Sequence, residues 1–155
     1  FVFRPLLTDL ARDWEGENIK EFTDIVKKMM ILIGALTIAA CVGAYLLGIP
    51  ILSLVYGVDL RAYRMELVII MICGGLNAYV YCLYYVVTVT GKQIFLLLGY
   101  GAGLIFAVFL GSGFVKSLGM LGAALSCTLS FGVVFIVFLI ITSCVVKDRK
   151  KKTEV

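Results

Sequence analysis

The sequence contains no histidine, only two prolines and a single tryptophan among its 155 residues. The absence of histidine removes the commonest metal ligand and the usual proton-shuttling side chain. Five cysteines are present, but they form no Cys-X-X-Cys pair and all lie in apolar stretches, as small packing residues do. We therefore expect no disulfide, no bound metal and no cofactor.

Charge is also missing from most of the chain. Four long runs carry no Asp, Glu, Lys or Arg, over residues 29–56, 67–91, 93–115 and 117–146. Even the shortest, with 23 residues, exceeds the roughly 18–20 apolar residues that cross a hydrocarbon core. A charged side chain at mid-membrane costs about 2.5–3.5 kcal/mol on insertion scales. The runs therefore predict an all-α membrane protein with four transmembrane helices.

A soluble helical bundle is the alternative explanation. It would need polar outer faces on its helices, and these runs offer none. The hydrophobic content of 62% also lies well above the roughly 45–50% of soluble domains. We therefore prefer the membrane.

Basic residues are distributed unevenly around the four runs. Four crossings place both termini and the connection between the second and third runs on one side, which then holds eleven of the 14 Lys and Arg residues. The other side has only Arg61, Arg64 and Lys116. The positive-inside rule therefore predicts a multi-pass protein of the cell (cytoplasmic) membrane with both ends in the cytoplasm. The basic tail, residues 147–155, can meet anionic lipid headgroups, and we expect membrane lipid rather than nucleic acid as its partner.

The predicted organisation has three parts. Residues 1–28 form a cytoplasmic connector that is expected either to contain an interfacial helix or to fold against the bundle, with 1–7 as a candidate tail of a preceding span. Residues 29–146 form the four-span membrane domain, followed by the tail. The chain begins with Phe1 rather than Met. Processing or trimming would explain this, but we favour the C-terminal portion of a longer protein.

The first run is too long for a simple perpendicular span, since 28 helical residues measure about 42 Å. Gly48 and Pro50 are the expected helix kink, because proline removes a backbone donor and clashes with the preceding turn.

Small residues recur at helical spacing in three runs. The predicted packing residues include Gly99, Gly103, Ala107 and Gly111 in the third run, Gly122, Ser126 and Ser130 in the fourth, and Ala35, Ala39 and Gly43 in the first. Close backbone approach supplies much of helix association in lipid, so we expect these stripes to be structural.

Within the four runs there is no Asp, Glu, Lys, Arg or His, so we expect no enzymatic activity. The polar residues of the second run share one helical face: Asn77, Tyr81, Tyr84, Tyr85 and Thr88. This face could line an aqueous cavity in which hydroxyl groups and rings contact sugars. Alternatively, Asn77 bonds to a neighbouring helix, typically for about 0.6 kcal/mol, and the tyrosines form an interfacial belt. We favour the second interpretation.

The order of several short motifs points to a family. These motifs are Arg4-Pro5-Leu6, Leu47-Gly48-Ile49-Pro50-Ile51-Leu52, Tyr56-Gly57-Val58-Asp59-Leu60, Thr88 and Thr90 with Gly91-Lys92, and Leu118-Gly119-Met120-Leu121-Gly122-Ala123-Ala124. Together they resemble the polysaccharide biosynthesis proteins, the lipid-linked oligosaccharide flippases of bacterial envelopes. These belong to the MOP superfamily and are similar in fold to multidrug exporters of the MATE type.

The resemblance implies a fold and a function. The chain would supply the last four spans of a twelve-span MATE-like transporter, with the remaining spans of the same transporter as its partners. Such a protein flips polysaccharide repeat units on an undecaprenyl-type lipid carrier across the membrane by alternating access. No membrane cation of this chain matches those that bind the carrier pyrophosphate in the family. Two alternatives stay open: a self-contained four-span scaffold or partner subunit, and a fragment of a MATE-type drug/cation antiporter.

Overall fold

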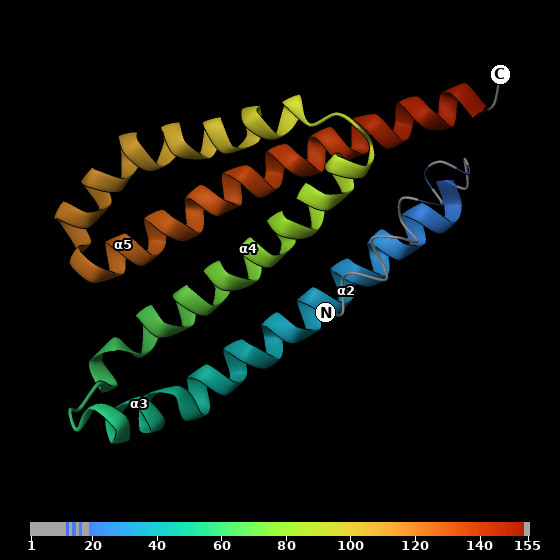
Figure 1. Ribbon diagram of the computed structural model, residues 1–155. Helices are drawn as coiled ribbons and strands as arrows, with labels where there is room; N and C mark the ends of the chain where they lie inside the picture. The colour runs from blue at the N-terminus through green and yellow to red at the C-terminus, as the bar shows by residue number, and fades with distance from the viewer. Residues whose placement is uncertain (1–11, 13, 15, 17–18, 154–155) are drawn as a thin grey trace.

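The computed structural model describes residues 12, 14, 16 and 19–153, with side chains described as far as Arg149. In order, the elements are α2 (Ile19–Gly43), a π-helical turn (Ala44–Gly48), α3 (Ile49–Tyr56), a 3₁₀ turn (Arg61–Tyr63), α4 (Arg64–Val89) and α5 (Ile94–Thr153). No strand occurs in the described ranges. The long helices lie side by side with their axes roughly aligned, although the chain runs in opposite directions in some of them (Figure 1).

Three helical stretches are long and apolar enough to cross a membrane: Ile19–Tyr56, Arg61–Val89 and Ile94–Arg149. The predicted all-α, membrane-type architecture is confirmed at this level. The expected number of spans was four, whereas the structure has three such stretches. The difference arises in α5, which contains both the third and the fourth uncharged runs in one element of 60 residues.

α5 is not straight, because it reverses direction at Gly119 (Figure 1). This residue has φ 58° and ψ −128°, a conformation that glycine adopts readily and other residues avoid. Three close contacts join the two arms: Gly99 with Phe138, Gly103 with Val134, and Gly111 with Ser126. In each pair the two residue numbers add up to the same value. A constant sum identifies antiparallel packing, so α5 is a hairpin of two helical arms.

The helix that contains the start of the first predicted span, 29–56, already begins at Ile19 and runs without a break past residue 28. Lys and Glu are good helix formers, so the charges before Met29 end the uncharged run without ending the helix. Phe22 and Met29 are both buried, 1% and 2% exposed, so one face of α2 continues through the expected boundary.

α4 lies at the centre of the bundle. It runs antiparallel to the first helical stretch, since Gly48 contacts Leu67 near the start of α4 and Gly34 contacts Tyr79 farther along it. It runs parallel to the second arm of α5, because Ile69 lies beside Thr128 and Tyr79 packs against Phe135. The largest buried cluster joins α4 to both arms of α5 and comprises Val80, Leu83, Val87, Leu96, Val134 and Phe138.

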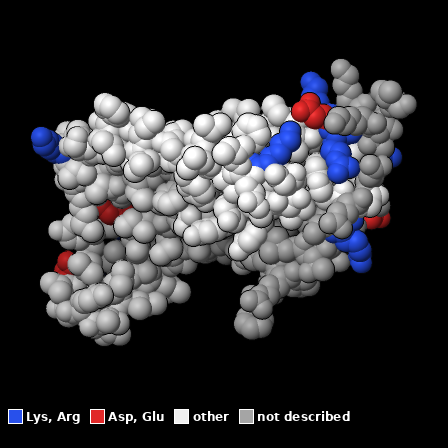
Figure 2. All heavy atoms as spheres, turned by 45° about the horizontal axis from the view of Figure 1, so that its top comes forward, with Lys and Arg blue, Asp and Glu red and all other residues white. Residues whose placement is uncertain are grey.

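Large apolar side chains cover the outside of the bundle. Leu54 is 85% exposed and Phe109 is 78% exposed, which suits contact with lipid chains better than contact with water. Charged residues lie at the two ends. Figure 2 shows most Lys and Arg side chains gathered towards one end, with pale uncharged surface between the ends. The Arg149 Cζ lies 4.7 Å from the centre of the Trp14 ring, so the start and the end of the described chain meet at this basic end.

Candidate functional site

The polar face of α4 is the candidate site. Its opposite face is fixed by packing, because Val80, Leu83 and Val87 belong to the buried cluster shared with α5. Tyr81 and Tyr85 consequently point away from that cluster, and they are 55% and 38% exposed.

The other three predicted residues, Asn77, Tyr84 and Thr88, are half-buried. The Thr88 hydroxyl donates to the Tyr84 carbonyl at 2.8 Å, so it is satisfied within its own helix. The rings of Tyr84 and Tyr85 meet edge-on, with centroids 5.5 Å apart. Among the described residues the Asn77 side chain makes no hydrogen bond, so the structure contains no bond from Asn77 to a neighbouring helix of this chain.

A fourth tyrosine joins this face from another helix. Tyr100, in the first arm of α5, lies close enough to Tyr81 and Tyr84 for electrostatic interaction, and its ring meets Phe138 edge-on. The sequence pattern could not reveal this neighbour, because Tyr100 belongs to a different run and reaches α4 only through the packing of α5. We call Tyr81, Tyr84, Tyr85 and Tyr100 the tyrosine cluster.

A shallow cavity of about 210 Å³ opens beside the tyrosine cluster and is lined by Ala78, Tyr81, Cys82 and Tyr85. Its lining is almost wholly apolar, and its size suits only a small group. Tyr79 points elsewhere, towards Gly34 of α2 and the Phe135 ring.

The predicted packing residues divide into two groups. Gly99, Gly103 and Gly111 lie against the second arm of α5, and Gly122 lies against the Phe114 carbonyl at the turn. Ser126 is buried, and its carbonyl accepts a hydrogen bond from Ser130 Oγ at 2.8 Å. In contrast, Ala35 and Ala39 of the first stripe are exposed, so the described chain does not cover them.

At the predicted kink, the π-helical turn Ala44–Gly48 leads directly into α3, and Pro50 is the second residue of that helix. A proline lacks the N–H and crowds the carbonyl four residues earlier, so the widened turn relieves that clash. A side chain added at Gly48 would meet Leu67 of α4. Arg4-Pro5-Leu6 and the rest of residues 1–7 lie outside the described residues.

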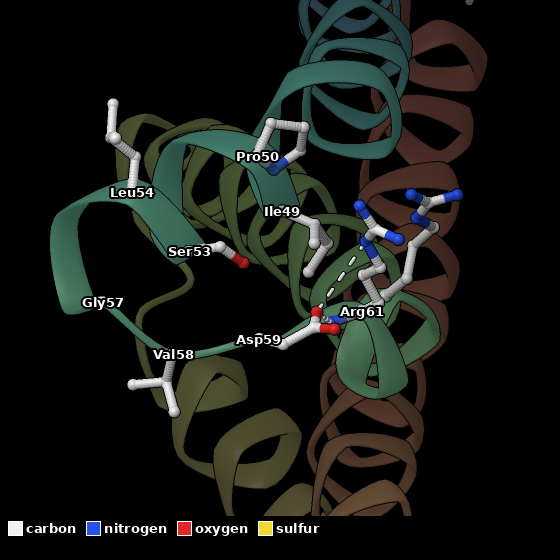
Figure 3. Close-up of a pocket in the computed structure, with 9 residues that line it drawn as sticks. Ile49, Pro50, Ser53, Leu54, Gly57, Val58, Asp59 and Arg61 are labelled. Atoms are coloured by element: carbon white, nitrogen blue, oxygen red, sulfur yellow. Dashed lines mark hydrogen bonds and ion pairs between the residues drawn. The ribbon is translucent and has the colours of Figure 1, made fainter.

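A second, larger cavity of about 680 Å³ lies beside α3 and the start of α4 (Figure 3), at the end of the bundle away from the C-terminus (Figure 1). It is lined by Ile49, Pro50, Ser53, Leu54, Gly57, Val58, Asp59, Arg61 and Arg64. Sequence reasoning missed this cavity. The sequence signal for it is the pair Arg61 and Arg64, two cations close together on the side of the membrane that is otherwise poor in Lys and Arg.

Searches of protein-family models, curated proteins and solved structures find no match to this chain. Within the described ranges there is no group of three His, Cys, Asp or Glu side chains that could hold a metal ion.

Proposed function

We propose that the chain is part of a membrane transporter and crosses the bilayer four times. The four crossings are the stretch that ends at Tyr56, α4, and the two arms of α5 on either side of Gly119. Each arm of α5 has at least 25 residues, about 37 Å of helix, which is enough to cross a hydrocarbon core of about 30 Å. The basic end lies in the cytoplasm, because it carries most of the Lys and Arg residues.

The observation that carries this proposal is the open tyrosine cluster. Hydroxyl groups that face hydrocarbon lose hydrogen bonds to water, and this is unfavourable unless another partner replaces them. Tyr81 and Tyr85 are exposed, whereas Val80, Leu83 and Val87 of the same helix are buried against α5. A water-containing path beside α4 would satisfy these hydroxyls and offer them to a polar substrate.

The proposed substrate is a lipid-linked oligosaccharide, flipped across the bacterial cytoplasmic membrane by alternating access. The resemblance of the ordered motifs to polysaccharide flippases supports this substrate, and so does the chemistry of the cluster, since tyrosine rings stack on sugars and their hydroxyls bond to them. The exposed small residues Ala35 and Ala39 suit contact with further spans of the same transporter.

The test is transport by the full-length protein in proteoliposomes, with a fluorescent lipid-linked oligosaccharide as substrate. We expect the double variant Tyr81→Ala, Tyr85→Ala to lower the initial rate about tenfold, equivalent to about 1.4 kcal/mol. Tyr56→Ala is the matched control, because Tyr56 is also exposed, at 68%, but lies in α3. An unchanged rate in the double variant would remove the tyrosine cluster from the path. Transport of organic cations instead of the lipid would identify a drug/cation antiporter.

The four-span scaffold remains the second candidate, but its proposed contact surface is already occupied. Gly99, Gly103 and Gly111 pack within the α5 hairpin and are not free to pair with a second copy. A discrete oligomer of the chain in detergent, together with no transport by the full-length protein, would favour the scaffold.

A further inference from the structure

The larger cavity, between α3 and the start of α4, combines charged and apolar walls. Figure 3 shows Ile49 and Ser53 on the side that faces Asp59 and Arg61, while Leu54 and Val58 point away from them. The loop that closes the cavity is held in place by two hydrogen bonds: the Leu60 N–H donates to Ser53 Oγ at 3.2 Å, and the Arg61 N–H donates to Asp59 Oδ1 at 3.0 Å.

The charges that line the cavity do not balance. Asp59 is the one carboxylate among the lining residues, and it faces two arginines. Its Oδ1 lies 3.8 Å from Arg61 Nε and also accepts a hydrogen bond from the Arg61 backbone N–H, so the charge of Asp59 is paired with that of Arg61. Glu66 lies nearby in the sequence but does not line the cavity, and its Oε2 is buried without a hydrogen-bond partner.

Arg64 therefore has no carboxylate partner among the residues that line the cavity. Its guanidinium lies 5.4 Å from the centre of the Tyr45 ring, which holds the side chain in place through a cation–π contact. Its Nε is buried and has no hydrogen-bond acceptor among the described residues. An atom this buried cannot touch a group in the open cavity, so the two Nη groups of Arg64, which are not buried, are the donors available to an anion there.

We propose that this cavity binds the phosphate group of an anionic phospholipid, with Arg64 as the main phosphate ligand and Arg61 as the second. Guanidinium groups bind phosphate through paired N–H donors in a fixed fork. The apolar wall identifies the lipid as the source of the phosphate, because Leu54 and Val58 line the cavity and are 85% and 59% exposed. A free phosphate would use only the polar wall, whereas a phospholipid would use both.

This site is distinct from the tyrosine cluster. Arg64 begins α4 and the cluster lies towards the other end of that helix, so lipid binding here does not rest on the proposed transport. It requires only that the chain resides in a membrane.

The test uses the chain purified in a non-ionic detergent and titrated with phosphatidylglycerol, with retained lipid counted by native mass spectrometry. We expect Arg64→Gln to lower the affinity about tenfold and Arg64→Lys to lower it less, because lysine keeps the charge but not the fork. Lys116→Gln is the matched control, since Lys116 is a cation at the same end that does not line the cavity, and it should change the affinity less than about twofold.

Asp59→Asn is the second variant. Removing the only lining carboxylate should raise the affinity for phosphatidylglycerol, and a gain cannot result from unfolding. Equal losses for Arg64→Gln and Lys116→Gln would reduce the effect to general surface charge and overturn the proposal. Displacement of the lipid by millimolar inorganic phosphate would assign the site to free phosphate instead. Failure of the wild-type chain to retain any phosphatidylglycerol would also overturn it.

Discussion

The two sides of α4 differ in composition and in contact. The side that meets α5 is apolar and closed, with Val80 and Leu83 each 1% exposed, whereas the side that carries Tyr81 and Tyr85 is open and includes hydroxyl groups. In a soluble protein, the open polar side would simply face water. In a helix that carries no charge after Glu66 and is long and apolar enough to cross a bilayer, exposed tyrosine hydroxyls need an explanation, and the proposed one is a water-containing path beside them.

The buried cluster behind the closed side should be the more sensitive to substitution, and the largest effect is expected at Gly99 of α5, which packs against Phe138 of that cluster. A side chain there would overlap the Phe138 ring, which is fully buried. We expect Gly99→Leu to destabilise the α5 hairpin by about 3 kcal/mol, at the upper end of the usual overpacking range.

Unfolding in increasing mole fractions of SDS measures this effect. Gly101→Leu is the matched control, because nothing lies within 4 Å of the position that its side chain would take. Equal stability of the two variants would show that the arms of α5 do not pack as described.

A smaller but more specific effect is expected where α4 meets the second arm of α5. Cys73 Sγ and Cys127 Sγ lie 3.3 Å apart, as free thiols. Mild oxidation with copper phenanthroline should join them, with the loss of two hydrogen atoms, because a disulfide needs only a small further approach. Mass spectrometry of proteolytic fragments should find the segments that hold Cys73 and Cys127 linked, while Cys82 and Cys144 remain reduced. A link between any other pair would contradict the parallel packing of these helices.

The open side should differ from the closed side in access to water. In a version with all five native cysteines replaced, we expect Tyr81→Cys to react with a membrane-impermeant maleimide about tenfold faster than Val80→Cys, because the reactive thiolate forms only where water reaches it. The measurement is the labelling rate of the full-length protein in membranes. If the thiol at position 81 never reacts, the tyrosines form a lipid-facing belt and line no aqueous path.

Part of this comparison could be predicted from the sequence alone. The uncharged runs located the membrane-type helices, and the spacing of Tyr81 and Tyr85 placed them on one face, because both properties depend on local sequence. Tyr100 and the thiol pair could not be predicted, since they depend on how the α5 hairpin folds back. An interfacial helix within 1–28 was expected, but its unbroken continuation into the first span was not, because charged residues limit the uncharged run without breaking a helix.

The central claim is that four crossings connect the two ends of the bundle, with α5 crossing twice. Single cysteines in place of Lys92 and Lys116, in the cysteine-replaced protein, test it directly through labelling with an impermeant maleimide in right-side-out and inverted vesicles. These residues flank the first arm of α5, one before Ile94 and one before Gly119. We predict that position 116 is labelled only from outside and position 92 only from inside. Labelling of both positions from the same side would contradict the four-span account.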